Sequence, residues 1–241
     1  MTKILADVHC HTIASDHAYS TVLEMAKAAS EAGLEAIAIT DHGPELGDGP
    51  HWWHFDNLKI IPREIWGVKI LRGIELNILD GQGAVDRIPR STMSGLDIVV
   101  ASIHSPCYDS GGRKDHTSSY MGALENPFVD ILGHSGTAAY PYDHLAVAKR
   151  ARELGKLIEI NQHSFVGRSS SIPNCKRIAE ACKEAGTGIV VNSDAHITFD
   201  LGDYSDALSL LKSIDFPEEL IINRSYRTLK EFLRPRKIIG E

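Results

Sequence analysis

The sequence lacks the features of a membrane protein, of a disulfide-stabilised domain and of a nucleic-acid-binding protein. No apolar run approaches the roughly 20 residues that a helix needs to cross a bilayer. The four cysteines, at positions 10, 107, 175 and 182, form neither a disulfide framework nor a paired Cys-x-x-Cys zinc motif. Lysine and arginine total 25 against 32 acidic residues, and this net charge of −7 disfavours binding to long nucleic acids.

Three further absences bear on the cellular location, the catalytic mechanism and the number of domains. Met1 stands almost directly before an apolar run, with no charged leader and no cleavage site, so we expect a cytoplasmic protein. No Ser-His-Asp or Cys-His arrangement suggests a protein nucleophile. The 241 residues contain no linker or shift in composition, and we therefore expect a single domain over residues 1–241. The sequence is compatible with a homo-oligomer.

Short apolar runs alternate with helical patterns along the chain. Near-continuous apolar runs of this length are typical of strands buried on both faces of a parallel sheet. Helices are predicted at 21–32, 144–154, 175–185 and 226–233, the third after Asn174 and the last after Ser225 as N-cap. The seven predicted strands cover residues 3–8, 36–40, 68–74, 97–103, 129–132, 156–160 and 188–191. This alternation predicts an α/β fold built from βα units.

The ends of the predicted strands favour a closed barrel over an open sheet. Histidine, at 12 residues, is abundant, and most runs end in a residue able to bind metal. The carboxyl ends of strands in a parallel barrel share one mouth, where active sites lie. The residues at these ends are His9, His11, His42, Glu75, His104, His134, Asn161, Asp194 and His196. Seven strands would form an irregular relative of the eight-stranded barrel.

Two motifs place pairs of ligands on one face of a strand. In His9-Cys10-His11 the two rings project together, and Cys10 points into the packing behind the strand. Asp194-Ala195-His196 repeats this geometry in the last run, which lies beside the first in a closed barrel. A mixed nitrogen and oxygen ligand set suits zinc, manganese or iron better than magnesium or calcium.

Single residues complete the predicted site. Glu75 is our candidate for a bridge between two metals, because a carboxylate has two oxygens and an imidazole serves one ion. Asp41 is either a turn or N-cap residue or a partner that orients a ligand histidine. Strand alternation makes Arg72 face the opposite side of the sheet from Glu75, away from the mouth of the barrel. We expect Arg72 to form a structural ion pair between the strand and the helix layer.

The ordered set His9-x-His11-Thr12, Ile39-Thr40-Asp41-His42-Gly43, Gly73-Ile74-Glu75, His104, His134 and Ser193-Asp194-x-His196 resembles the PHP (polymerase and histidinol phosphatase) family. The segments around His17 and around His51-Trp52-Trp53-His54 are similar to its small stand-alone phosphatases of the YcdX type. The resemblance implies a distorted (β/α)7 barrel with a trinuclear metal site that hydrolyses phosphate esters. It implies a first metal on His9, His11, Glu75 and Asp194, a second on Glu75, His104 and His134, and a third on His17, His42 and His196.

The chain departs from this family at His163, where a small polar residue is expected. His163 is either a substrate contact or a solvated loop residue, and Arg168 in the following loop is a candidate phosphate contact. His51, His54 and Asp41 are candidates for the proton donor. The long Gly/Pro-rich segment 43–50 is expected to form an active-site loop.

Three functions follow from these observations. The first is a metal-dependent phosphatase that hydrolyses a small phosphomonoester through a hydroxide bound to the metals, most simply three zinc ions, with Mn²⁺ or Fe²⁺ as alternatives. The second is an amidohydrolase-like amide or lactone hydrolase, although no predicted strand ends in the lysine that such a site would use to bridge metals. The third is a non-catalytic metal-binding regulatory module, which the nine filled ligand positions disfavour.

Overall fold

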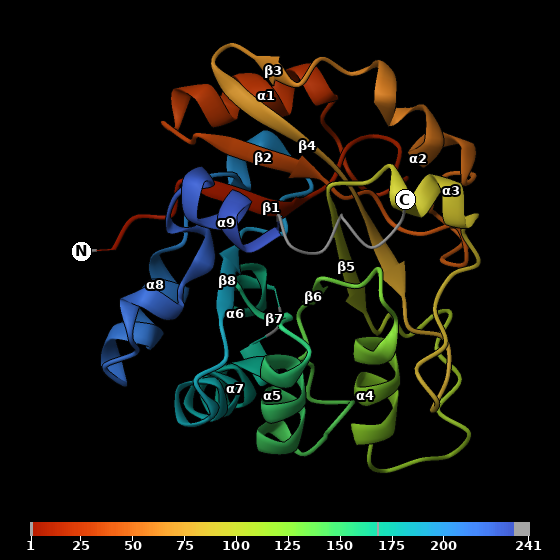
Figure 1. The fold of residues 1–241 in the computed structure, drawn as a ribbon, viewed down its shortest axis with the longest axis vertical. Helices are drawn as coiled ribbons and strands as arrows, with labels where there is room; N and C mark the ends of the chain where they lie inside the picture. The colour runs from red at the N-terminus through yellow and green to blue at the C-terminus, as the bar shows by residue number, and fades with distance from the viewer. Residues whose placement is uncertain (1, 168, 234–241) are drawn as a thin grey trace.

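A computed structural model describes residues 2–167 and 169–233 of the chain. Seven parallel strands stand in the order β1-β2-β4-β5-β6-β7-β8 and form a nearly closed barrel (Figure 1). A short strand, β3 (Glu64–Ile65), was not predicted and pairs antiparallel with β4. The parallel strands are β1 (Ala6–Cys10), β2 (Ala36–Ile39), β4 (Val68–Asn77), β5 (Ile98–Ser102), β6 (Ile131–Leu132), β7 (Leu157–Asn161) and β8 (Ile189–Asn192). The predicted distorted (β/α)7 barrel is confirmed.

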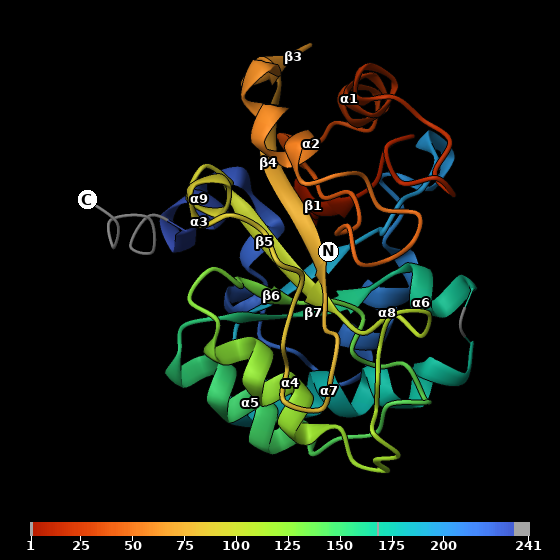
Figure 2. The same cartoon turned by 90° about the vertical axis from the view of Figure 1, so that its right-hand side faces the viewer.

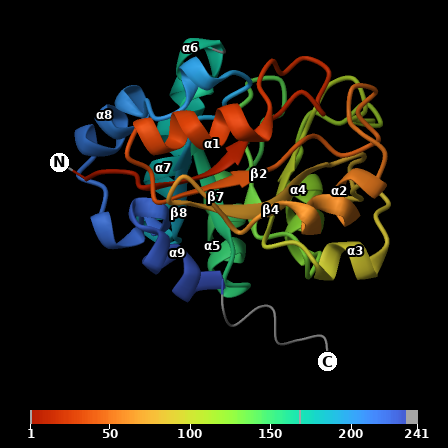
Figure 3. The ribbon, with the colours of Figure 1, turned by 90° about the horizontal axis from the view of Figure 1, so that it is seen from above.

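The helices form the outer layer of the barrel. Figures 1 and 2 show α4, α5 and α7 side by side along one flank, and Figure 3 shows α1 outside β2. The helices are α1 (Val22–Glu31), α2 (Trp53–Asn57), α3 (Arg90–Ser94), α4 (Thr117–Glu125), α5 (His144–Glu153), α6 (His163–Val166), α7 (Ile172–Ala185), α8 (Ser205–Ser213) and α9 (Tyr226–Leu233). Several predicted elements differ at their ends: β4 and α7 are longer than predicted, whereas β5, β6 and α1 are shorter and β1 is displaced toward His9.

Capping explains where the long helices begin and end. The hydroxyl of Thr21 accepts from the Glu24 backbone N–H, and the Glu24 carboxylate accepts from the Thr21 N–H, which is the predicted capping box of α1. Helix α7 starts at Ile172, one turn earlier than predicted, so Asn174 lies inside it and is not its N-cap. It ends as predicted at Gly186, whose φ of 68° suits a residue without a side chain.

The first and last strands meet along a seam that side chains complete. The backbone N–H of His11 donates to the Ala195 carbonyl at 2.9 Å, and that of Asp194 donates to the His9 carbonyl at 3.0 Å. Further down, the buried amide of Asn223 donates to the Ala6 carbonyl at 2.8 Å and to the Val191 carbonyl at 2.6 Å. This amide joins the two strands where their own backbone pairing is interrupted.

Two apolar clusters fill the fold. The inner cluster lies inside the barrel, takes one or two residues from each parallel strand, and is closed at one end by Leu229 and Leu233 of α9. The outer cluster packs between the strands and the surrounding helices, and it includes Cys10, as predicted. Within residues 2–167 and 169–233, no helix combines the length and the apolar character needed to cross a membrane.

A bulge in β1 aims the first two histidines. The pairing of β1 with β2 shifts register between Asp7 and Cys10. Val8 belongs to the inner cluster, and the next residue, His9, is fully buried beside other inward-facing polar groups. Before the bulge the even-numbered residues Ala6 and Val8 face the inside of the barrel, and after it the odd-numbered residues His9 and His11 do. The apolar core therefore lies under the strand's first half and the histidines lie at its carboxyl end.

Candidate metal centre

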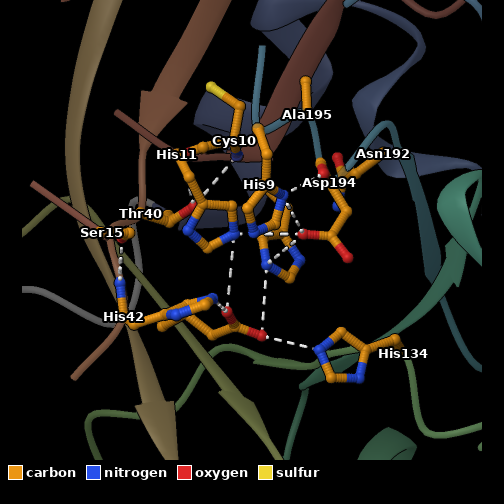
Figure 4. A network of polar contacts seen from close by, with 12 residues as sticks. His9, Cys10, His11, Ser15, Thr40, His42, His134, Asn192, Asp194 and Ala195 are labelled. Atoms are coloured by element: carbon orange, nitrogen blue, oxygen red, sulfur yellow. Dashed lines mark hydrogen bonds and ion pairs between the residues drawn. The ribbon is translucent and has the colours of Figure 1, made fainter. Parts of the chain in front are cut away.

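The nine predicted ligand residues converge at the carboxyl ends of the strands. His9 lies in β1 and Glu75 in β4, and the others stand in the loops that follow the strands or, for His17, in the segment before α1. Figure 4 shows the rings of His9, His11, His42 and His134 gathered around one centre with Asp194, while Cys10 points away. Side chains far apart in the sequence, such as those of His9 and Asp194, thus share one site.

The Glu75 carboxylate lies at the centre of this group and is fully buried. Its Oε1 lies 3.2 Å from His9 Nε2, 3.0 Å from His134 Nε2 and 3.5 Å from His104 Nε2. Its Oε2 lies 3.3 Å from His42 Nε2 and 3.6 Å from His11 Nε2. Burial alone raises the pKa of Glu75, but the rings of His9 and His104 outweigh this and hold it well below its usual value, so Glu75 is a carboxylate.

Asp194 supplies the second buried carboxylate. Its Oδ1 lies 3.1 Å from His11 Nε2 and 3.5 Å from His9 Nε2. The residue has a φ of 57°, in the left-handed region that costs energy for a side chain other than glycine. Burial raises the pKa of Asp194, yet the neighbouring histidines, His9 first, depress it well below the usual range.

The ring nitrogens differ in protonation according to their neighbours. Burial lowers the pKa of His104 to about 3, and burial together with the His11 ring lowers the pKa of His196 to about 3. Both rings are therefore neutral, as metal ligands must be. For His9, burial lowers the pKa, but Glu159, Glu75 and Asp194 together raise it well above its usual value. In the metal-free protein these carboxylates therefore favour the positively charged form of the ring.

Several atoms of this cluster fit metal ions and have no hydrogen-bond partner among the described residues. His9 Nε2, His11 Nδ1, His196 Nε2 and both oxygens of Glu75 are buried without a hydrogen bond. An unsatisfied buried polar atom costs roughly 1–3 kcal/mol, and coordination to a cation removes that cost. Within the described residues, four groups bring their ligand atoms within 4.8 Å of one another: His9, His11 and Glu75; His42, Glu75 and His104; His11, His42 and His196; and His17, His42 and Asp48. The donor set is nitrogen and oxygen, which suits zinc.

A cavity of about 780 Å³ opens in front of these ligands. One side is formed by ligand histidines and by His163, which begins α6. The predicted loop 43–50 borders the cavity through Leu46, Gly47 and Asp48. The cavity thus gives a small substrate access to the metal-binding atoms.

Comparison with known proteins identifies the family. A family model described as PHP domain matches residues 7–169. The chain belongs to the PHP family. "Probable phosphatase TTE1963" from Caldanaerobacter subterraneus is 47% identical over 241 residues, which cover 99% of this chain and 94% of the relative. A "Probable phosphatase" from Acetivibrio thermocellus is 45% identical over 235 residues, 98% of this chain and 97% of the relative.

A solved PHP-type fold is also similar. The crystal structure of histidinol phosphate phosphatase from Lactococcus lactis, complexed with zinc, L-histidinol and phosphate, superposes with a TM-score of 0.58. It covers 90% of this chain and 95% of its own chain at 18% identity, a level at which the likeness concerns the fold.

The three ligand sets implied by the PHP family each come together. The first set is joined by the Asp194 and Glu75 contacts described above. In the second, the ring centroids of His104 and His134 lie 5.1 Å apart, on Oε1 of Glu75. In the third, the His17 centroid lies 4.9 Å from that of His42 and 4.5 Å from that of His196. The metal assignments themselves stay predictions.

Three residues that sequence reasoning missed hold the second nitrogen of a ligand ring. His9 Nδ1 lies 2.8 Å from Glu159 Oε1, and His104 Nδ1 lies 2.7 Å from Asn77 Oδ1. Asp48 contacts Nδ1 of His17 and, at 3.3 Å, Nδ1 of His42. Such contacts fix the tautomer and the direction of a ligand ring. Glu159 and Asn77 stand at inward positions of apolar strands, a signal that was visible, whereas Asp48 lies in a loop without periodicity.

The Glu159 carboxylate is buried and saturated with donors. It accepts from the backbone N–H of His134 at 2.7 Å, from Asn161 Nδ2 at 3.0 Å and from Asn192 Nδ2 at 2.8 Å. Burial raises its pKa, but the charge and hydrogen bond of His9 outweigh burial and lower it, so Glu159 is ionised.

The predicted proton donors lie beside the site and do not line the cavity. Asp41 is buried and accepts from the Thr12 N–H at 2.7 Å, from the Ser15 hydroxyl at 3.0 Å and from His54 Nε2 at 3.1 Å. Asp41 was expected to be either a turn or N-cap residue or a partner of a ligand histidine. Instead its carboxylate connects two loops and contacts His54, which is not a predicted ligand. His51 is exposed, and its Nδ1 accepts from the Trp53 N–H.

Two further predictions about arginines have different outcomes. Arg168, the candidate phosphate contact, lies outside the described residues. Arg72 points out of the barrel, as predicted. In place of the expected ion pair, its guanidinium donates to the backbone carbonyls of Lys59 at 2.7 Å and Ile61 at 3.3 Å.

Proposed function

We propose that this PHP-family protein is a phosphatase that hydrolyses a small phosphomonoester with three divalent metal ions, most simply zinc. The observation that carries the proposal is the buried Glu75 carboxylate, whose two oxygens lack hydrogen bonds and face five histidine rings. The names of the PHP relatives, aligned over nearly the whole chain, support the phosphatase activity. The proposed cytoplasmic location fits a sequence whose four cysteines form no disulfide framework.

The nine ligands would divide among three ions as the PHP family implies, with Glu75 shared by two of them. Divalent ions held there would lower the pKa of a coordinated water and neutralise the charge of a phosphate group. The chain's own residues prepare this arrangement. The Glu75 charge reduces the repulsion between neighbouring cations, and Glu159, Asn77 and Asp48 keep the ligand rings turned toward the centre.

The remaining assignments concern the substrate. His163 lines the cavity, and its ring centroid lies 6.3 Å from that of His196, which supports a role in contacting the phosphate. Arg168 follows α6 in the chain and keeps the same predicted role. Of the three predicted proton donors, we favour His54, because the Asp41 carboxylate orients its ring.

The alternative functions have less support. The amidohydrolase-like reading needs a lysine that bridges metals, and no lysine is among the described residues that line the cavity. A non-catalytic module would tolerate the loss of ligands, whereas here every predicted ligand side chain reaches the cluster.

The test is a screen of phosphate esters with protein of measured metal content. Zinc-loaded protein is assayed against sugar phosphates, nucleoside monophosphates and histidinol phosphate, before and after chelation. We expect hydrolysis that is abolished by the chelator and restored by the metal. His134→Ala should lose activity, while His144→Ala, at the start of α5 and away from the cluster, should retain it. Hydrolysis that resists chelation, or full activity in His134→Ala, would contradict the proposal.

A further inference from the structure

One wall of the cavity differs in chemistry from the rest. The histidine side is polar and contains the predicted metal ligands, whereas Pro106, Ala139 and Tyr140 give another part of the lining an apolar character, which Ser105 and Thr137 interrupt and to which the buried residues Ile103 and Leu46 add. Pro106 follows His104 closely along the chain, and Ala139 and Tyr140 follow His134. We call this apolar part of the lining the Tyr140 wall.

The Tyr140 ring is half-buried and firmly held. Its centroid lies 5.3 Å from the ring of Tyr108 and 5.3 Å from the ring of His116, both in edge-to-face geometry. Those two rings are joined to each other by a hydrogen bond of 2.6 Å between the Tyr108 hydroxyl and His116 Nδ1. The loop is also fixed by its backbone, since the His116 N–H donates to the Pro141 carbonyl at 2.9 Å. A ring held in this way presents a fixed apolar surface to the cavity.

The charges around the cavity restrict what can lie on the Tyr140 wall. The described lining residues include no lysine or arginine, and their only carboxylates are Asp48 and Asp194. Both carboxylates lie against ligand histidines. A second phosphate or an ammonium group placed against the Tyr140 wall would therefore lose water without gaining an ionic partner from the described lining residues near it.

We propose, resting on the phosphatase function above, that the substrate is the phosphomonoester of an uncharged alcohol that carries a flat apolar ring. The phosphate faces the metal ligands, and the ring lies on the Tyr140 wall in contact with Tyr140. Tyr140 is thereby a specificity-determining residue. Nucleoside polyphosphates, bisphosphates and amino alcohol phosphates are poor substrates.

The experiment compares 2-phenylethyl phosphate with ethyl phosphate on the zinc-loaded protein. Both leaving groups are primary alkanols of similar acidity, so a difference in kcat/KM measures the contact with the ring. We expect 2-phenylethyl phosphate to be favoured about tenfold or more. Tyr140→Ala should reduce the ratio of the two kcat/KM values by roughly three- to tenfold. Tyr140→Phe, which keeps the ring, should retain the preference.

A binding measurement supplies a readout independent of turnover. Calorimetry with 2-phenylethylphosphonate, which cannot lose its phosphorus group, should show weaker binding to Tyr140→Ala than to the parent or to Tyr140→Phe. Equal kcat/KM for the two esters, or an equal loss for both in Tyr140→Ala, would overturn the inference and leave the phosphatase function standing. Efficient hydrolysis of histidinol phosphate, which carries an ammonium group, would likewise overturn it. Failure to hydrolyse any phosphomonoester would instead overturn the proposed function itself, and the inference with it.

Discussion

Replacement of Glu159 by glutamine tests whether a residue that touches no metal controls metal binding. Glu159 holds Nδ1 of His9 at 2.8 Å and accepts from the His134 N–H at 2.7 Å, so it contacts two predicted ligands that belong to different metals. Glutamine keeps the size of the side chain but has one acceptor oxygen in place of two. Its amide NH₂ must therefore face at least one of the four donors that now surround the carboxylate.

The size of the effect follows from these contacts. Loss of a carboxylate that orients a ligand histidine typically weakens metal binding by about 10- to 100-fold. At about 1.4 kcal/mol for each factor of ten, this corresponds to roughly 1.4–2.8 kcal/mol of binding free energy. A buried donor left facing another donor costs a further 1–3 kcal/mol, roughly, in the free energy of unfolding. The metal-free variant should therefore be less stable than the metal-free parent.

The measurement is zinc affinity by competition with a chromophoric chelator, together with urea unfolding of the metal-free protein. Glu153→Gln is the matched control, because it makes the same chemical change at a side chain that is 63% exposed and paired with Arg150. An exposed ion pair contributes about 0–1 kcal/mol, so this variant should bind zinc like the parent. If Glu159→Gln binds zinc within twofold of the parent, the orienting role assigned to Glu159 is wrong.

Three further predictions concern the cluster and the barrel seam. By elemental analysis, Glu75→Gln should lose close to two of the three ions, because two cations share its charge, whereas His17→Ala should keep two. The pKa of His9 is raised well above 6.5 in the metal-free protein, so metal binding should release protons and become tighter as the pH rises. Calorimetry in buffers of different ionisation enthalpy measures this proton release. The same raised pKa stabilises the metal-free fold below about pH 6.5, and this stabilisation is lost as the pH rises through the pKa of the folded state. Asn223→Ala should lower the free energy of unfolding by roughly 2–4 kcal/mol in urea, because two strand carbonyls lose their donor, and an unchanged midpoint would contradict the role of this amide.

The sequence predicts the barrel because its parallel strands carry unbroken apolar runs. It also predicts which side chains gather at the mouth of the barrel, because the carboxyl ends of parallel strands meet there. The limits come from contacts that local patterns do not record. The bulge in β1 makes Val8 and His9 face inward in succession, which a strict alternation forbids. Helix α7 begins at Ile172 although Asn174 looks like a better N-cap, and α7 contacts the preceding helix α6.

The residues that orient the ligands illustrate a second limit. Glu159 interrupts an apolar strand between Leu157 and Asn161, so its inward position can be recognised, but the nitrogen it contacts depends on how β1 and β7 lie across the barrel. Asp48 lies in a loop, and its contacts with His17 and His42 depend on how two loops fold over each other. The alternation of residues along a strand shows which side of the sheet a side chain faces. It does not show which side chain of another strand it contacts across the barrel.

The seam closed by Asn223 also has a consequence for biosynthesis. Ribosomes add about 5–20 residues per second, so roughly 10 to 40 seconds separate the synthesis of His9 from that of Asn223. Throughout this interval the nascent chain already displays histidines, while the joining of β1 to β8 awaits Asn223. Contacts between such distant segments form slowly, because a long loop must close first. We therefore expect the complete ring of predicted ligands to form only after Asn223 has been synthesised, so that the ions enter a closed barrel rather than guide the growing chain.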